Sequence, residues 1–263
     1  MYIGVPTGWS KEYSILYMLA SLRNLDYPAD RLRLTFACTL IEGHPNFSMY
    51  HERLVQLVEA ANMPFTTRVI TTTLTDKDLD RWGSYMGVIR NLHALRLDFF
   101  KKRVDPWRYF WVLGGDNPPP RDLLCKMMKC KSDVVSALIR QRPVACAKGT
   151  VYGDPYPVIW SHHWKLKDIP RDLEPVNREE LRRAWREFAF LKRWDGKTFN
   201  DVVFGSGCSL IKREVLECQG YTLGYAGNHS EDLHFCQMAM IHGFHTEVIE
   251  DWCPHFDPDG KIY

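Results

Sequence analysis

The chain has 263 residues, of which 45% are hydrophobic and 25% charged, and its formal net charge is +2. This composition is typical of a globular protein with room for one large domain or two small ones. The near-neutral balance excludes binding of long polyanions through overall charge, but it does not exclude a local basic groove.

The eight cysteines are scattered and form no Cys-x-x-Cys pair. Several lie in apolar stretches such as "LTFACTL" and "FGSGCSL", where a reduced cysteine packs as a small hydrophobic residue, so free thiols are favoured over a disulfide framework. The N-terminus "MYIGVPTGW" lacks the basic and apolar regions of a signal peptide, and no apolar run is long enough to span a bilayer. These features predict a reduced, soluble, cytoplasmic protein without stable membrane insertion.

Strands and helices alternate along the first half of the chain. Apolar runs that stop at glycine, proline or polar residues predict five strands, over residues 2–7, 33–40, 65–72, 108–115 and 132–139. Apolar residues at helical spacing predict four helices, one that Ser10 caps and that ends near residue 25, and three over residues 51–62, 85–102 and 121–129. Strands separated by helices indicate right-handed crossovers and a mostly parallel α/β sheet.

In such a sheet, ligands bind beyond the carboxyl ends of the strands. These ends are expected at Pro6-Thr7-Gly8, at the "TLIEGH" turn and at "GGDNPPP". In the last stretch Gly114 and Gly115 allow a close backbone approach, Asp116 offers a carboxylate and the prolines stiffen the exit.

The alternation breaks at about residue 141. The stretch "VYGDPYPVIWSHHWKL" is rich in aromatic residues, proline and histidine, and we interpret residues 141–200 as a small insertion. It includes a helix that begins near Asn177, whose arginine-rich face is either solvated or part of an acceptor- or anion-binding wall. Residues 201–217 then predict a strand, a glycine-serine turn, another short strand and the start of a helix. Because there are no repeats or linkers, a single domain is expected.

Near the end of the chain, "NHSEDLHFCQMAMIHGF" predicts an amphipathic helix. Ser230 is expected as its N-cap, Glu231 and Asp232 lie in its first turn, and Gly243 is expected to stop it. Acids in a first turn are favoured by the helix dipole alone, so the pair does not by itself indicate chemistry.

The order of these segments resembles the glycosyltransferases of the GT-A fold, most closely the large family that contains many inverting enzymes. The resemblance extends from "IGVPT" to "CPHFDPDG", and its most specific part is the "SEDLHFC…GF" block. It implies one catalytic domain over residues 1–263 with a Rossmann-like, mostly parallel sheet flanked by helices. Residues 1–140 would be the nucleotide-sugar-binding half, and residues 141–263 the acceptor-side half with the acidic helix and a C-terminal histidine.

The resemblance implies a divalent cation, Mn²⁺ or Mg²⁺, held against the diphosphate of the donor. Asp116 matches the second aspartate of the family's Asp-x-Asp motif, whereas Gly114 stands in place of the first. His255 matches a histidine that completes the metal sphere in many relatives, and Asp257 and Asp259 are near enough in the sequence to substitute for it. In this role the cation neutralises the leaving nucleoside diphosphate.

The acidic pair resembles the family's catalytic pair. In an inverting enzyme, Asp232 would be the general base that accepts the proton of the acceptor hydroxyl, with Glu231 beside it. In a retaining enzyme the pair would instead orient the substrates.

The resemblance also implies a site for a UDP- or GDP-sugar. Its residues would be Pro6, Thr7, Glu42, Arg90, Gly114, Gly115, Asp116, Gly205, Ser206 and Gly207. Arg90 is equally well explained as a surface residue, and the glycines near residue 206 by tight packing at a strand corner.

The sequence therefore predicts a metal-dependent glycosyltransferase of the hexosyltransferase type. Its acceptor would be a saccharide, a protein, a small molecule or a nucleic-acid base. The alternatives are a non-catalytic nucleotide- or sugar-binding module, a nucleotidyltransferase, and a zinc protein that uses the histidines and Cys253. The spacing of those residues fits no standard zinc pattern.

Overall fold

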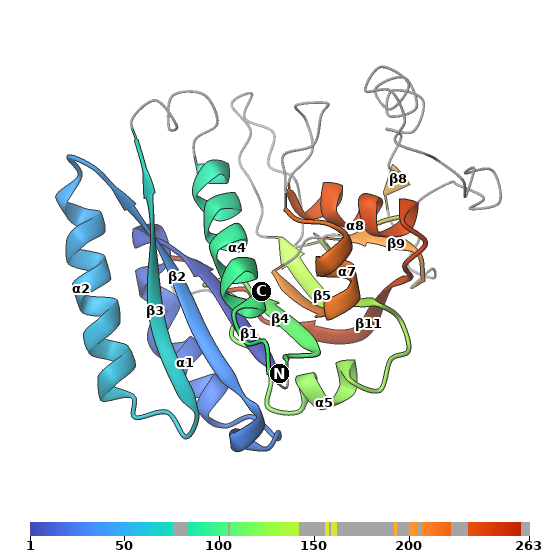
Figure 1. The fold of residues 1–263 in the computed structure, drawn as a ribbon, viewed down its shortest axis with the longest axis horizontal. Coiled ribbons are helices and arrows are strands. Elements are labelled where there is room, and N and C mark those ends of the chain that lie inside the picture. The colour runs from blue at the N-terminus through green and yellow to red at the C-terminus, as the bar shows by residue number, and fades with distance from the viewer. Residues whose placement is uncertain are drawn as a thin grey trace.

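A computed structural model of the chain describes residues 1–75, 84–104, 106–141, 156–157, 159–161, 192–193, 200–204, 207–221 and 231–258. Its centre is a sheet in the order β3-β2-β1-β4-β10-β5-β11 (Figure 1). The strands are β1 (Tyr2–Thr7), β2 (Arg33–Ile41), β3 (Thr66–Leu74), β4 (Tyr109–Leu113), β5 (Val134–Gln141), β10 (Cys208–Lys212) and β11 (Thr246–Cys253). Only β10 among these seven runs antiparallel to its neighbours, β4 and β5. The expected mostly parallel α/β sheet is confirmed.

The described part of the insertion adds short strands. β6 (Tyr156–Pro157) pairs with β5, and β7 (Ile159–Ser161) pairs antiparallel with β8 (Lys192–Arg193) and β9 (Val202–Phe204). The expected helix near Asn177 lies outside the described residues.

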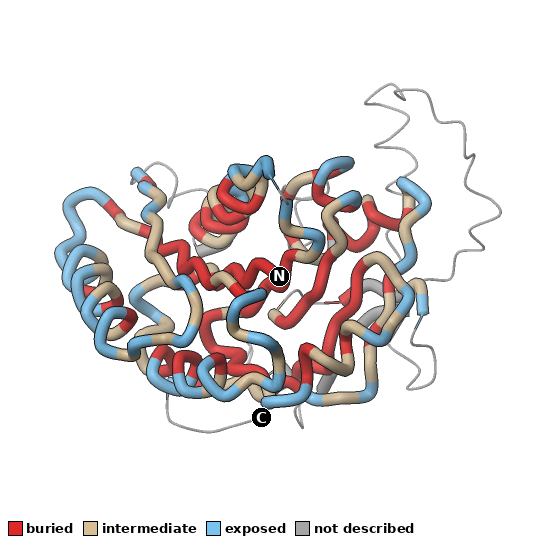
Figure 2. Tube along the Cα trace, turned by 60° about the horizontal axis from the view of Figure 1, so that its bottom comes forward, coloured by how far each residue is buried: buried red, intermediate tan, exposed pale blue. Residues whose placement is uncertain are grey.

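Helices cover both faces of the large sheet. They are the 3₁₀ helices η1 (Trp9–Ser14) and η2 (Ala29–Arg31), and the α-helices α1 (Ile15–Arg23), α2 (Pro45–Ala60), α4 (Ser84–Phe100), α5 (Leu123–Met127), α7 (Arg213–Cys218) and α8 (Glu231–Ile241). One core lies between the sheet and α1, α2 and α5, and a second lies between the opposite face and α4, α7 and α8. Figure 2 shows buried residues concentrated along the central strands and exposed residues at the periphery.

Alternation along each strand supplies both cores. In β4, Trp111 and Leu113 pack in the first core, whereas Phe110 and Val112 pack in the second. Successive side chains of a strand point to opposite faces, so a strand that is buried on both faces is apolar throughout. This explains why the stretch "YFWVL", which the sequence predicted as a strand, is apolar at every position.

Two predicted helix starts were wrong. Ser10 does not cap the first helix, because Gly8 opens a 3₁₀ turn in which Lys11 N donates to Gly8 O at 2.8 Å, and α1 begins at Ile15. The second helix begins at Pro45 rather than at His51. Proline at the first helical position is favourable because its missing N–H would have no partner there.

Candidate active site

The site begins where β1 and β4 end side by side. Because these strands are parallel neighbours, Pro6 and Thr7 lie next to Gly115. A Cβ added to Gly115 would lie 3.1 Å from Thr7 Oγ1 and 3.3 Å from Pro6 O, so glycine permits the close approach that the sequence predicted there. Ser14 Oγ, at the end of η1, donates to Gly115 O at 2.6 Å and fixes this turn.

The neighbouring Gly114 is explained by packing. Its N–H donates to Gly207 O at 2.7 Å, which joins the end of β4 to the start of β10. The side-chain amide of Asn117 fills the space beside both glycines, and a Cβ on Gly114 would overlap Asn117 Oδ1. Asn117 is held there because its Nδ2 donates to Pro254 O at 3.2 Å. An aspartate at position 114 would therefore require the side chain of Asn117 to move.

Asp116 is buried, with 4% of its surface exposed, and three polar side chains lie close to its Oδ2 atom. His255 Nε2 lies 3.0 Å from this oxygen, Tyr13 OH lies 3.4 Å from it, and Lys11 Nζ forms an ion pair with it. Burial raises the pKa of Asp116, but the hydrogen bond with His255 and the positive charge of Lys11 outweigh it and lower the pKa to about 2. The carboxylate is therefore ionised at neutral pH.

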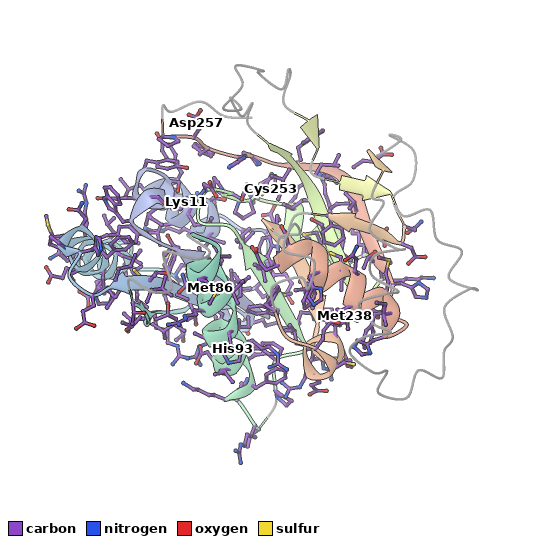
Figure 3. The ribbon with its side chains drawn as sticks, turned by 90° about the horizontal axis from the view of Figure 1, so that it is seen from above. Lys11, Met86, His93, Met238, Cys253 and Asp257 are labelled. Carbon is purple, nitrogen blue, oxygen red and sulfur yellow. The ribbon has the colours of Figure 1, made fainter. Side chains whose placement is uncertain are left out.

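The C-terminal segment carries His255 to this carboxylate. Phe256 N donates to Asp116 O at 2.9 Å, and Tyr13 OH donates to Phe256 O at 3.2 Å. In Figure 3, Lys11 lies on the same side of the molecule as Cys253 and Asp257, which mark this segment. The pairing of Asp116 with His255 was predicted as a shared ligand set, and the structure brings the two side chains together.

Asp116 and His255 suit a divalent cation chemically. Carboxylate oxygen and imidazole nitrogen are both ligands for Mn²⁺, and two neighbouring ligands at about 2.1 Å in an octahedral shell are about 3 Å apart. In the part of the chain that the structure describes, no cluster of three or more His, Cys, Asp or Glu side chains forms a metal site. Water and substrate oxygens are suitable ligands for the remaining positions.

A cavity of about 560 Å³ opens at the carboxyl ends of β2 and β3. It is lined by Leu40, Ile41, Glu42, Gly43, His44, Pro45, Ser48 and Thr73. Glu42 is exposed within this lining, and Arg90 Nη1 donates to Thr73 O at the cavity wall. Of the predicted nucleotide-binding residues, the structure thus places Glu42 in the cavity lining and Arg90 in contact with that lining.

Thr7, which was also predicted to bind the nucleotide, forms its hydrogen bonds with residues of the interior. Thr7 Oγ1 lies 2.7 Å from Tyr50 OH, and Asn91 Nδ2 donates to Thr7 O at 3.0 Å. Asn91 Nδ2 also donates to Thr39 Oγ1 at 2.9 Å, and Thr72 Oγ1 donates to Asn91 Oδ1 at 2.5 Å. Asn91 therefore ties together the carboxyl-terminal parts of β1, β2 and β3.

The acidic pair opens α8 as predicted. Glu231 is buried, and this burial together with the negative charge of Asp232 raises its pKa to about 7. Asp232 is partly exposed. The helix ends as expected: Gly243 has a φ of +84° and its N–H donates to Met240 O at 2.9 Å, which is the glycine stop of a Schellman motif.

Sequence reasoning missed three polar residues of the site: Lys11, Tyr13 and Asn117. Lys11 and Tyr13 follow a strand end, but their 3₁₀ turn has no apolar period that would have marked it. Of the predicted residues, Gly205, Ser206, Ser230 and Asp259 lie outside the described residues. The seven described cysteines are free, as expected. None of the described helices is both long and apolar enough to cross a membrane.

No protein-family model and no curated protein sequence matches the chain. Solved structures do resemble it. The mannosyltransferase PcManGT from Pyrobaculum calidifontis, solved with GDP-Man and Mn²⁺, is 14% identical with a TM-score of 0.54, and the match covers 96% of this chain and 55% of that one. S. aureus TarS 1-349, solved with UDP-GlcNAc, is 13% identical with a TM-score of 0.50, over 95% of this chain and 56% of that one.

The chain thus spans little more than half the length of these neighbours. The similarity over nearly all of its own length, together with the sheet order and the single antiparallel strand β10, shows that the chain has the GT-A fold. At this level of identity the likeness concerns the fold alone.

Proposed function

We propose that this chain is a glycosyltransferase that moves a sugar from a nucleoside-diphosphate sugar to an acceptor hydroxyl. The observation that carries the proposal is the contact between Asp116, at the end of β4, and His255, which returns to it from the C-terminal segment. An ionised, buried carboxylate with an imidazole beside it at a strand end is suited to holding a cation against phosphate oxygens.

Asp116 and His255 would hold the Mn²⁺ or Mg²⁺ ion. When bound, the cation supplies positive charge to the diphosphate as it leaves. The chain adds Lys11 at the same carboxylate, which is a second positive charge next to the expected diphosphate. The Mn²⁺ in the PcManGT structure agrees with this proposal for a chain of the same fold.

The cavity at the ends of β2 and β3 is proposed to take the nucleoside. Its volume of about 560 Å³ is within the range of small-molecule sites. Glu42 would accept hydrogen bonds from the base or from the ribose, and Arg90 would form part of the wall beside Thr73. Pro6, Thr7, Gly115 and Gly207 would shape the floor on which the diphosphate and the sugar lie, together with Gly205 and Ser206.

For the transfer itself we propose Asp232 as the general base. It would accept the proton of the acceptor hydroxyl while that oxygen bonds to the anomeric carbon and the bond from this carbon to the diphosphate oxygen breaks. A single displacement of this kind inverts the configuration. Asp232 is the more exposed member of the acidic pair, which favours it over Glu231 for contact with an acceptor.

Residues 1–263 are proposed to act as one catalytic domain, because β10 and β11 from the second half of the chain complete the sheet of the first half. The donor is proposed to be a UDP- or GDP-sugar, and the transferred group a hexose. The acceptor is a saccharide, a protein, a small molecule or a nucleic-acid base.

The decisive experiment measures hydrolysis of nucleotide sugars in the presence of Mn²⁺. A panel that includes GDP-Man and UDP-GlcNAc would be tested with wild type, Asp116→Ala and Asp232→Asn. Asp30→Ala is the control, because Asp30 is an exposed aspartate in η2. We expect metal-dependent release of nucleoside diphosphate that Asp116→Ala abolishes and Asp30→Ala preserves.

Two other outcomes would change the proposal. Nucleotide binding by calorimetry without release from any donor would favour a non-catalytic binding module. If no donor releases nucleoside diphosphate and no nucleotide binds, the proposed function is refuted and only the fold remains.

A further inference from the structure

We propose that Lys11 is a mobile counter-cation: it neutralises Asp116 in the empty site and moves to the diphosphate when the donor binds, which makes metal and nucleotide bind cooperatively. This inference rests on the proposed function. It concerns a residue that the sequence did not single out and that lies next to the expected metal ligands.

The first argument is the position of Lys11. It lies in η1, directly after β1, and its Cβ packs 3.4 Å from where a Cβ of Gly115 would be. Its stem therefore crosses the glycine turn that precedes Asp116. The side chain of Lys11 is 32% exposed, whereas that of Asp116 is 6% exposed, so the ion pair joins a partly exposed lysine to a buried carboxylate.

The second argument is competition for one oxygen. Lys11 contacts Asp116 Oδ2, and the same oxygen lies 3.0 Å from His255 Nε2. An ammonium has three donors and no lone pair, so it cannot be a metal ligand. Because Lys11, His255 and Tyr13 already surround this oxygen, a cation held between Asp116 Oδ2 and His255 Nε2 would take the place of the ammonium and repel it.

The third argument is charge. Displacing Lys11 without a new anion leaves an ammonium beside a divalent cation, so binding of the metal alone is opposed by repulsion. A nucleoside diphosphate supplies phosphate oxygens that accept the ammonium. The flexible four-carbon stem of a lysine allows such a move without any change in the backbone. Each ligand should then strengthen the binding of the other by the same factor.

The test measures Mn²⁺ affinity by calorimetry, and by electron paramagnetic resonance of free Mn²⁺, with and without GDP or UDP. Wild type is compared with Lys11→Met, which keeps the length of the stem but removes the charge. Lys126→Met is the matched control, because Lys126 on α5 forms ion pairs with Asp122 and Asp251 away from the site.

In wild type and in Lys126→Met, we expect the nucleotide to raise Mn²⁺ affinity by about 10- to 100-fold. In Lys11→Met, Mn²⁺ alone should bind about tenfold more tightly than in wild type, and the gain caused by the nucleotide should be correspondingly smaller. Lys11→Arg, which retains the charge, should keep weak binding of the metal alone.

The inference is overturned if Lys11→Met binds Mn²⁺ alone no better than wild type does, or if its gain from nucleotide equals that of wild type. Wild type offers an independent arm in case Lys11→Met does not fold, since equal Mn²⁺ affinity with and without nucleotide would also overturn it. If wild type binds both ligands without coupling, only this inference fails. If wild type binds neither ligand, the proposed function fails as well.

Discussion

The side chain of Asn117 occupies the volume that any side chain on Gly114 would need. The amide is buried and anchored to Pro254 O, so it cannot swing away without losing a hydrogen bond. The absence of the first acid of an Asp-x-Asp motif is therefore coupled to the presence of Asn117. Packing against Asn117 explains why position 114 is a glycine in this chain.

From this relationship we predict non-additive effects of substitution. Gly114→Ala should lower the free energy of unfolding by about 1 to 3 kcal/mol through overpacking. Asn117→Ala creates the missing space, so the double variant should lose at least about 1 kcal/mol less than the sum of the single variants. Urea denaturation of all four proteins measures this difference.

Gly8→Ala provides the control, because a Cβ on Gly8 would meet no atom within 4 Å. It should change stability by less than about 0.5 kcal/mol. Strict additivity of Gly114→Ala and Asn117→Ala would show that the two residues do not compete for space.

The Asp116 carboxyl predicts a loss of stability in acid. Its pKa is lowered from 3.8 to about 2, so the folded state favours the ionised form. The resulting stabilisation, about 2 kcal/mol, is fully present above pH 4 and is lost as the pH falls through 2. The stability gap between wild type and Asp116→Asn should therefore narrow from pH 5 toward pH 2, as followed by urea midpoints. A gap that stays constant over this range would contradict the prediction.

Glu231 predicts the opposite dependence. Its pKa is raised from 4.5 to about 7, so the folded state favours the protonated form. Below pH 4.5 Glu231 does not reduce the stability of the folded state, but a loss of stability of about 3 kcal/mol develops as the pH rises from 4.5 to 7. Glu231→Gln removes the charge. The free energy of unfolding of Glu231→Gln, minus that of wild type, should therefore be larger at pH 8 than at pH 4.

Thermal or urea unfolding of both proteins at pH 4, 6 and 8 measures this effect. Glu217→Gln is a suitable control, because Glu217 lies at the surface on α7 and pairs with Arg213 there. The same stability difference between wild type and Glu231→Gln at pH 4 and pH 8 would refute the burial argument.

The cavity predicts a role for Glu42 in nucleotide affinity. Glu42 is exposed, so Glu42→Gln should leave stability unchanged while it removes a charged acceptor from the cavity lining. We expect the affinity for nucleoside diphosphate to fall about tenfold, which corresponds to about 1.4 kcal/mol. Calorimetry measures it, with Glu59→Gln near the end of α2 as control. Equal losses in both variants would point to overall charge instead of a contact in the cavity.

Much of the local structure could be predicted because local patterns encode it. The run "YFWVL" is apolar at every position since both faces of β4 are buried, and Gly243 ends α8 because only a residue tolerant of positive φ fits there. The glycine pair before Asp116 predicted a close approach of the backbone for a different reason, namely that glycine has no Cβ to collide with its neighbours. Where local rules compete, prediction failed: the stretch before His51 was left out of the predicted helix, but its proline, Pro45, is the first residue of α2.

The sequence by itself determined the alternation of strands and helices, the acidic turn that follows β4 and the acids that open α8. Only the tertiary structure decided which side chains meet there. Lys11 reaches Asp116 across 105 positions, and His255 reaches it across 139. The side-chain amide of Asn117 lies against Gly207 in the same way. These contacts follow from the order of strands in the sheet, which places β4 between β1 and β10. Hydrophobic periodicity acts over one or two turns of chain and carries no information about that order.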